Sequence, residues 1–221
     1  MPTRVIERLN QIEMTPQQVP VVVIHPIEGH VNMLRSWAKQ MKYPVFGVQF
    51  TQEAMQYETV EQLAEFYWTQ IEKEILRHSS TGVVVPRIHL CGYSFGSPVA
   101  FEMAGKRHGR VASLTFLDGC HSYVNGQLSV FRNRFPMVEL VNRMGEVESE
   151  ILYMFVQQYV PTMITKREFV EELVRLSTLE QRIRYVVREL LSKSQFQFDQ
   201  FDLELAARSY VNKMLMAIKY Q

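Results

Sequence analysis

Short apolar runs alternate with amphipathic segments over the first half of the chain. Residues 21–24 form a continuous apolar run, and three further runs, at residues 44–50, 87–92 and 111–117, are mainly apolar. In three intervening segments the apolar positions recur every three or four residues, at 31–41, 59–75 and 95–107. Apolar runs of this length are typical of parallel strands buried on both faces, and the second pattern predicts helices. We therefore expect about four parallel strands joined by helical crossovers, with their carboxyl ends at one edge of the sheet.

The alternation stops near residue 126, and the rest of the chain has helical periodicity only. Thr165 and Thr178 each stand three residues before a Glu or Gln, a capping-box pattern that also occurs at Thr59. These patterns predict an α/β fold with a helical lid. The expected parts are a lead-in segment at 1–19, the α/β core at 20–126 and the lid subdomain at 127–221.

Composition narrows the class of protein. The 24 basic and 23 acidic residues nearly balance, which favours neither nucleic acid nor an anionic membrane as partner. No apolar stretch approaches the roughly 18 residues of a membrane span, and the first residues lack a signal-peptide pattern. Cys91 and Cys120 lie in or beside apolar runs and are expected to be buried thiols in a reducing compartment. We expect a soluble cytoplasmic protein that holds no metal and no cofactor of its own.

A G-x-S-x-G motif links the third predicted strand to the helix that follows it. Ser94 lies at the centre of the motif, and Gly92 and Gly96 flank it. A strand, a sharp turn and a helix in this order form the nucleophile elbow of α/β-hydrolases. The flanking glycines are expected because the strand and helix pass too close for a Cβ at either position. The alternative is a serine in an ordinary strand-to-helix turn.

Two further positions fall at the same predicted edge of the sheet. The chain has three aspartates, Asp118, Asp199 and Asp202, and only Asp118 closes a predicted strand. Asp118 is therefore the candidate triad acid, and a turn aspartate is the alternative. Backbone N–H groups of Phe95 and Ile27 are the candidate donors of an oxyanion hole. The loop that contains Ile27 could also serve only to start the next helix.

The catalytic base is not found in the sequence. In α/β-hydrolases the histidine follows the acid along the chain, but the last histidine here is His121, three residues beyond Asp118. Its loop is too close to Asp118 for it to bridge the two groups, while His25 and His30 precede the elbow and favour a structural role. We predict that the catalytic histidine is absent.

Five segments together resemble the thioesterase domain of animal type I fatty acid synthase. They are His25-Pro26-Ile27-Glu28-Gly29, Gly92–Gly96 followed by Val99-Ala100-Phe101-Glu102-Met103, Asp118–Val124, Phe155-Val156-Gln157-Gln158 and Ala206-Ala207-Arg208-Ser209. The resemblance implies release of a long-chain fatty acid from the phosphopantetheine arm of acyl carrier protein through an acyl-serine at Ser94, with Asp118 as acid. It also implies a hydrophobic acyl groove between core and lid. Tyr123 and Phe131 are candidate groove residues, with core packing as the alternative for each.

Members of that family continue into further strands and a Gly-Asp-His loop, which this sequence lacks. We therefore expect a C-terminally truncated thioesterase that fails to turn over palmitoyl thioesters, with the strand at 111–117 as an exposed apolar edge. Two other functions stay open. One is a protein that binds acyl chains or carrier protein without hydrolysis, and the other is a polyketide-type or nonribosomal-peptide-type thioesterase.

Overall fold

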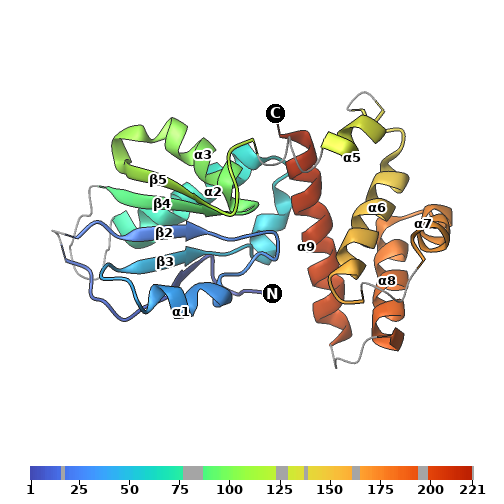
Figure 1. The fold of residues 1–221 in the computed structure, drawn as a ribbon, viewed down its shortest axis with the longest axis horizontal. Helices are drawn as coiled ribbons and strands as arrows, with labels where there is room; N and C mark the ends of the chain where they lie inside the picture. The colour runs from blue at the N-terminus through green and yellow to red at the C-terminus, as the bar shows by residue number, and fades with distance from the viewer. Residues whose placement is uncertain are drawn as a thin grey trace. The chain divides into compact units, whose positions relative to one another are not determined.

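The computed structural model describes residues 1–15, 18–76, 87–122, 129–136, 139–160, 165–193 and 199–220. The chain forms two compact units, Met1–Gln127 with Tyr220–Gln221, and Leu128–Lys219. The first unit is an α/β sheet structure, and the second consists of helices (Figure 1).

The α/β unit contains a five-stranded sheet in the order β1-β3-β2-β4-β5. Its strands are β1 Ile6–Arg8, β2 Val21–Ile24, β3 Val45–Val48, β4 Ile88–Tyr93 and β5 Val111–Leu117. The last four are parallel, as the apolar runs predicted, and β1 pairs antiparallel with β3. The expected lead-in segment at 1–19 thus contains a strand, β1, that the apolar pattern did not predict. With only three residues, this strand is too short to show a periodicity of its own.

Helices cover both faces of the sheet (Figure 1), and their bounds are α1 Arg35–Ala38, α2 Val60–Ile71 and α3 Gly96–Lys106. The predicted helix at 31–41 is shorter than expected, because its first turn is the 3₁₀ segment Asn32–Leu34. From β2 the chain passes to β3 on one side, whereas from β4 it passes to β5 on the other. The direction of winding therefore changes between β2 and β4, and ligands bind at such a switch point in parallel sheets.

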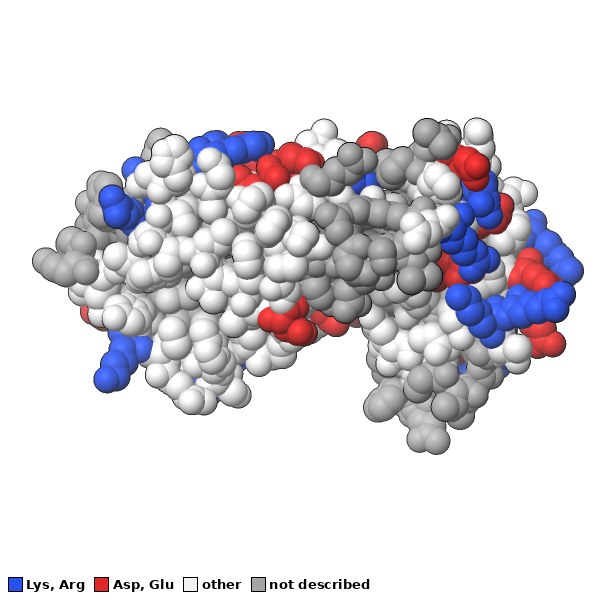
Figure 2. All heavy atoms as spheres, turned by 45° about the horizontal axis from the view of Figure 1, so that its top comes forward, with Lys and Arg blue, Asp and Glu red and all other residues white. Residues whose placement is uncertain are grey.

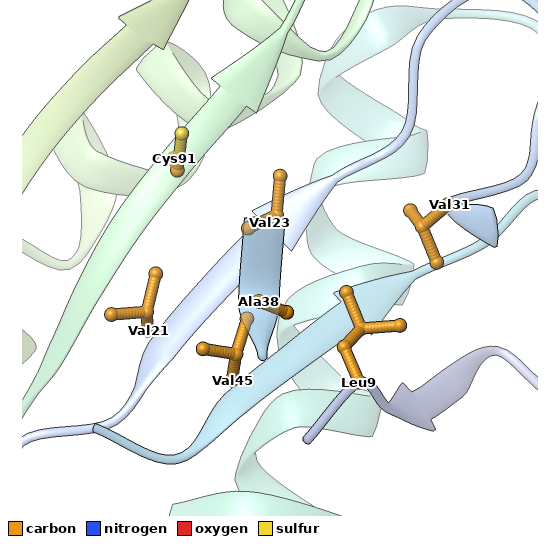
Figure 3. Packing of buried hydrophobic residues seen from close by; sticks show 7 residues of the cluster. All are labelled: Leu9, Val21, Val23, Val31, Ala38, Val45 and Cys91. Carbon is orange, nitrogen blue, oxygen red and sulfur yellow. The ribbon is translucent and has the colours of Figure 1, made fainter. Parts of the chain in front are cut away.

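A layer of buried aliphatic side chains joins α1 to its face of the sheet (Figure 3). The cluster consists of Leu9, Val21, Val23, Val31, Ala38, Val45 and Cys91. Branched side chains predominate on the strands of this cluster, as expected where a parallel sheet is covered on both faces. The packing fixes the positions of β2 and β4, and these two strands end beside the candidate site.

The outer edge of β5 has no strand beside it within the described part of the chain. Ala112, Ser113 and Thr115 are exposed on this strand, and Leu114 and Phe116 are partly exposed. The strand carries no charge and no proline, the two features that commonly protect an edge from pairing. Among the described residues, the expected edge position of the strand at 111–117 is confirmed, and its larger apolar side chains are partly exposed.

The helical unit packs α6 against α7, α8 and α9. Its described helices are α5 Ser129–Arg134, α6 Met144–Gln157, α7 Lys166–Arg175, α8 Leu179–Lys193 and α9 Gln200–Lys219. The capping box at Thr178 is confirmed, because Gln181 N–H donates to Thr178 Oγ1 at 3.2 Å and the Gln181 side chain accepts from Thr178 N–H. The box expected at Thr165 is wrong, since this side chain makes no cap hydrogen bond.

Charges on the helical unit are mixed in sign. Figure 2 shows Lys and Arg interspersed with Asp and Glu on the face in view. Arg143 pairs with Glu146 at 2.6 Å, and Arg167 pairs with Glu171 at 2.9 Å. Opposite charges that neutralise each other locally do not create the field that attracts a polyanion. No described helix is long and apolar enough to span a bilayer.

Candidate active site

Ser94 and Asp118 lie side by side where β4 and β5 end. Tyr93 and Leu117 are partners in the parallel ladder, and Ser94 N–H donates to the Leu117 carbonyl at 2.9 Å. Ser94 is partly exposed and Asp118 is exposed. Their φ angles are 50° and 47°, the only positive values among non-glycine residues of the described chain. Backbone strain of this kind concentrates at functional sites.

The elbow depends on two glycines, as the sequence predicted. A Cβ on Gly92 would lie 2.5 Å from the Gly96 carbonyl oxygen, and a Cβ on Gly96 would lie 2.6 Å from the Ile24 carbonyl oxygen. Real Cβ atoms essentially never come this close to a backbone oxygen. Only glycine lets β4, the start of α3 and the end of β2 converge here. The steric prediction is confirmed.

The loop after β5 runs against the elbow. A Cβ on Gly119 would lie 3.1 Å from the Ser94 carbonyl oxygen and 2.4 Å from Ser97 Oγ. Ser97 N–H donates to the Ser94 carbonyl at 2.9 Å, and Ser97 Oγ donates to the Gly92 carbonyl at 3.2 Å. The backbone around Ser94 is therefore held by bonds within the elbow and by contact with the neighbouring loop.

Two backbone donors remain available at the elbow and the loop after β2. Gly29, with φ of 84°, donates to the Pro26 carbonyl at 3.0 Å and accepts from Phe50 N–H at 2.8 Å. These bonds close the loop around Ile27, which is partly exposed. Hydrogen bonds within the described residues leave the N–H groups of Ile27 and Phe95 unused. Unused amides beside a strained serine are the arrangement that an oxyanion hole requires.

The buried side chain of His25 contacts both the loop after β2 and the elbow. Its side chain is completely buried, and the ring stacks on Phe95 with centroids 5.8 Å apart. Nδ1 lies 2.7 Å from the Pro26 carbonyl oxygen, and Nε2 lies 2.7 Å from the hydroxyl of Tyr67 on α2. Burial raises the pKa of Tyr67 well above its ordinary value, so the phenol keeps its proton. Both ring nitrogens of His25 are therefore engaged in structural bonds.

No hydrogen bond joins the other described histidines to Ser94. The exposed ring of His121 stacks on Phe101 of α3 with centroids 4.7 Å apart. His89 lies near the start of β4, at the opposite end from Ser94, and contacts Ser113 Oγ at 2.7 Å. Within the described residues, neither Ser94 Oγ nor the Asp118 carboxylate has a hydrogen-bond partner. No general base is therefore assembled by the part of the chain that the structure describes.

Of the two candidate groove residues, the structure describes only Phe131. Tyr123 lies outside the described residues. Phe131, in α5, packs its ring against the buried Phe135 with centroids 4.9 Å apart. The contact shows an aromatic pair within the helical unit, and Phe131 stays a candidate for the acyl groove.

Sequence reasoning did not single out Tyr67. It occupies the buried stripe predicted for the helix at 59–75, where a phenylalanine would satisfy the pattern equally well. The hydroxyl of a buried tyrosine normally needs a hydrogen-bond partner, and that requirement was the available indication. Its partner is 42 residues away in the chain, so the pairing depends on the fold.

The thioesterase-domain family profile matches residues 19–210 of this chain. A carboxylesterase structure from the thaumarchaeon Nitrososphaera gargenis is similar at 11% identity, covering 98% of this chain and 68% of that one with a TM-score of 0.50. The Vlm2 thioesterase domain bound with a dodecadepsipeptide matches at 17% identity, 100% and 73% coverage and a TM-score of 0.48. The NocB thioesterase domain, in covalent complex with a fluorophosphonate nocardicin G analogue, matches at 15% identity, covering 93% of this chain and 68% of that one with a TM-score of 0.47. The shared architecture is the α/β-hydrolase fold.

Proposed function

Because the chain belongs to the thioesterase-domain family, we propose that it is a serine thioester hydrolase in which Ser94 carries the acyl group. One observation carries the proposal. A serine with a left-handed backbone lies beside two segments whose Ile27 and Phe95 amides have no partner among the described residues, at the switch point of a parallel sheet. Carboxyl-end switch points are where parallel sheets bind their ligands.

The chemistry follows from this arrangement. Ser94 Oγ attacks the thioester carbonyl carbon, and the carbonyl oxygen becomes an oxyanion that accepts hydrogen bonds from Ile27 and Phe95 N–H. The carbon–sulfur bond then breaks, and the thiol leaves with the proton given up by Ser94. Water attacks the resulting ester, which releases the carboxylic acid and restores the serine hydroxyl. We assign to Asp118 the role of orienting the base and of stabilising the cation that forms when the base takes the Ser94 proton.

The described residues supply no general base for Ser94, and this limits the rate of acylation. Loss of one member of a catalytic triad can cost about 10⁶ in turnover, and the oxyanion hole alone supplies what remains. We expect the chain by itself to acylate slowly and to fail as a palmitoyl thioesterase. A base supplied from solution should restore acylation in proportion to its concentration.

For the substrate, we propose a long-chain acyl group on the phosphopantetheine arm of acyl carrier protein. Support comes from the motifs around Ile27, Ser94 and Asp118, which resemble the thioesterase domain of animal fatty acid synthase. No group of metal-ligating side chains gathers in the described ranges. The free thiols of Cys91 and Cys120 suit a reducing compartment such as the cytoplasm.

Imidazole rescue tests the function. The purified chain is mixed with palmitoyl-phosphopantetheine at rising imidazole concentration, and the mass of the intact protein is followed over time. We expect an imidazole-dependent palmitoyl adduct on Ser94 that is absent from Ser94→Ala and unchanged in Ser36→Ala, which alters an exposed serine of α1.

Other outcomes point to the competing functions. Palmitate binding without an adduct would make the chain a non-catalytic acyl binder. Faster acylation by a peptidyl thioester than by a palmitoyl thioester would favour a nonribosomal-peptide-type enzyme. An adduct that persists in Ser94→Ala would refute the assignment of the nucleophile.

A further inference from the structure

A buried chain of hydrogen bonds connects α2 to the loop that contains Ile27. Tyr67 and His25 are both fully buried, and the Tyr67 hydroxyl lies 2.7 Å from His25 Nε2. On the opposite side of the ring, Nδ1 lies 2.7 Å from the Pro26 carbonyl oxygen. Two consecutive hydrogen bonds thus link Tyr67, His25 and Pro26, which come from two distant parts of the sequence.

The direction of each hydrogen bond can be assigned. A carbonyl oxygen only accepts, so His25 Nδ1 must carry the hydrogen that bonds to Pro26. In the neutral ring Nε2 is then an acceptor, and the Tyr67 hydroxyl donates to it. The Pro26 carbonyl therefore selects the Nδ1–H tautomer of His25, and the Tyr67 hydroxyl, by donating to Nε2, holds the ring in one orientation.

The same ring also meets the second candidate donor segment. Its plane lies 16° from that of Phe95, with centroids 5.8 Å apart, and Phe50 meets the ring edge-on at 82°. The backbone makes contact as well, because a Cβ on Gly96 would lie 2.8 Å from the His25 carbonyl oxygen. Both amides of the proposed oxyanion hole, at Ile27 and Phe95, therefore belong to segments packed on His25.

We propose that Tyr67 is a positioning residue for the oxyanion hole and that it acts through His25. Its hydroxyl fixes the orientation of the imidazole by donating to Nε2, and the fixed ring sets the loop of Ile27 against the elbow of Phe95. Donors in an oxyanion hole must point to within tenths of an ångström of the developing charge, so a ring free to turn would misplace them. The catalytic part of this inference rests on the proposed function, whereas the tautomer and the ring orientation do not.

Nitrogen NMR of the full chain tests the structural part without any substrate. In the wild-type protein we expect His25 Nδ1 to be protonated and Nε2 to be unprotonated. In Tyr67→Phe, which keeps the ring and removes only the hydroxyl, we expect a shifted His25 Nε2 signal, because this nitrogen loses its donor, and shifted amide signals for Ile27 and Phe95. The control Tyr43→Phe removes the hydroxyl of a 46% exposed tyrosine in the same unit and should leave all three residues unchanged.

Two NMR results would overturn the inference. One is a wild-type His25 protonated on Nε2, which decides the question even if Tyr67→Phe does not fold. The other is a Tyr67→Phe spectrum in which the His25, Ile27 and Phe95 signals match those of the wild type.

Imidazole-supported acylation of Ser94 tests the catalytic part. Removing a whole oxyanion donor costs roughly 10²–10³ in rate, so displacing the donors should lower the acylation rate constant about tenfold with thioester affinity unchanged. Tyr43→Phe should acylate at the wild-type rate. An unaltered rate in Tyr67→Phe, or a loss confined to affinity, contradicts a positioning role. If the wild-type chain shows no acylation, the proposed function fails, and the NMR result alone decides whether Tyr67 fixes the loop.

Discussion

Replacement of Arg182 by methionine should destabilise the helical unit strongly. The Arg182 side chain is 7% exposed and that of its partner Glu148 is 12% exposed, with Nη1 2.8 Å from Glu148 Oε2. The guanidinium also donates to the carbonyls of Leu173, at 3.1 Å, and Leu176, at 2.5 Å. One side chain of α8 therefore joins α6 to the end of α7 and the turn that follows it.

The expected loss in the free energy of unfolding depends on the Glu148 charge, which the substitution leaves buried and unpaired. Removing one partner of a buried ion pair costs about 3–5 kcal/mol, because the other charge stays buried without compensation. In the double variant Arg182→Met/Glu148→Leu no unpaired charge remains. Only the two carbonyls lose a partner, at about 1 kcal/mol each. The double variant should therefore be at least about 2 kcal/mol more stable than the single one.

Glu148 also gives the prediction a pH dependence. Burial raises its pKa above the ordinary 4.5, and the Arg182 charge opposes the rise. A folded-state pKa above the unfolded value means that the folded protein loses stability as pH rises between the two values. Without Arg182 the pKa rises further, so the deficit of Arg182→Met should shrink between pH 7 and pH 5 as the carboxyl becomes neutral.

Urea denaturation followed by far-ultraviolet circular dichroism measures these differences in the free energy of unfolding. Both variants and the wild type are compared at pH 7 and at pH 5. The reasoning is refuted if Arg182→Met loses less than about 1 kcal/mol, or if the double variant is no more stable than the single one.

Two matched pairs of residues test other features of the structure. Thr178→Ala should lower the free energy of unfolding by about 1 kcal/mol, because its side chain caps α8, whereas Thr165→Ala should change it by less than about 0.5 kcal/mol in urea titrations. Equal losses would contradict the cap assignment. Burial raises the pKa of the Cys91 thiol to about 12, so iodoacetamide at pH 8 should alkylate the partly exposed Cys120 and spare Cys91. Mass spectrometry of tryptic peptides reports both sites, and rapid alkylation of Cys91 would show that β4 is accessible.

The pattern of apolar and polar residues along the chain predicted most of the strands of the α/β unit. Apolar runs located β2, β3, β4 and β5, and β2 and β3 are buried along their whole length, as a continuous apolar run predicts. The antiparallel β1 was missed because three residues carry too little pattern. The cap at Thr165 was predicted wrongly because the Thr-x-x-Glu spacing is necessary for a capping box but does not ensure the bond.

For the candidate site, the sequence by itself determined the elbow. The glycine spacing around Ser94 follows from sterics within a few residues, and Asp118 follows from the parallel order of two strands. Only the tertiary structure decided that His25 meets Tyr67, 42 residues away, and that Arg182 meets Glu148, 34 residues away. Each of these pairs joins groups whose burial and orientation are set by the packing of separate elements. A one-dimensional pattern records that a position is buried, but it does not record which polar group it meets there.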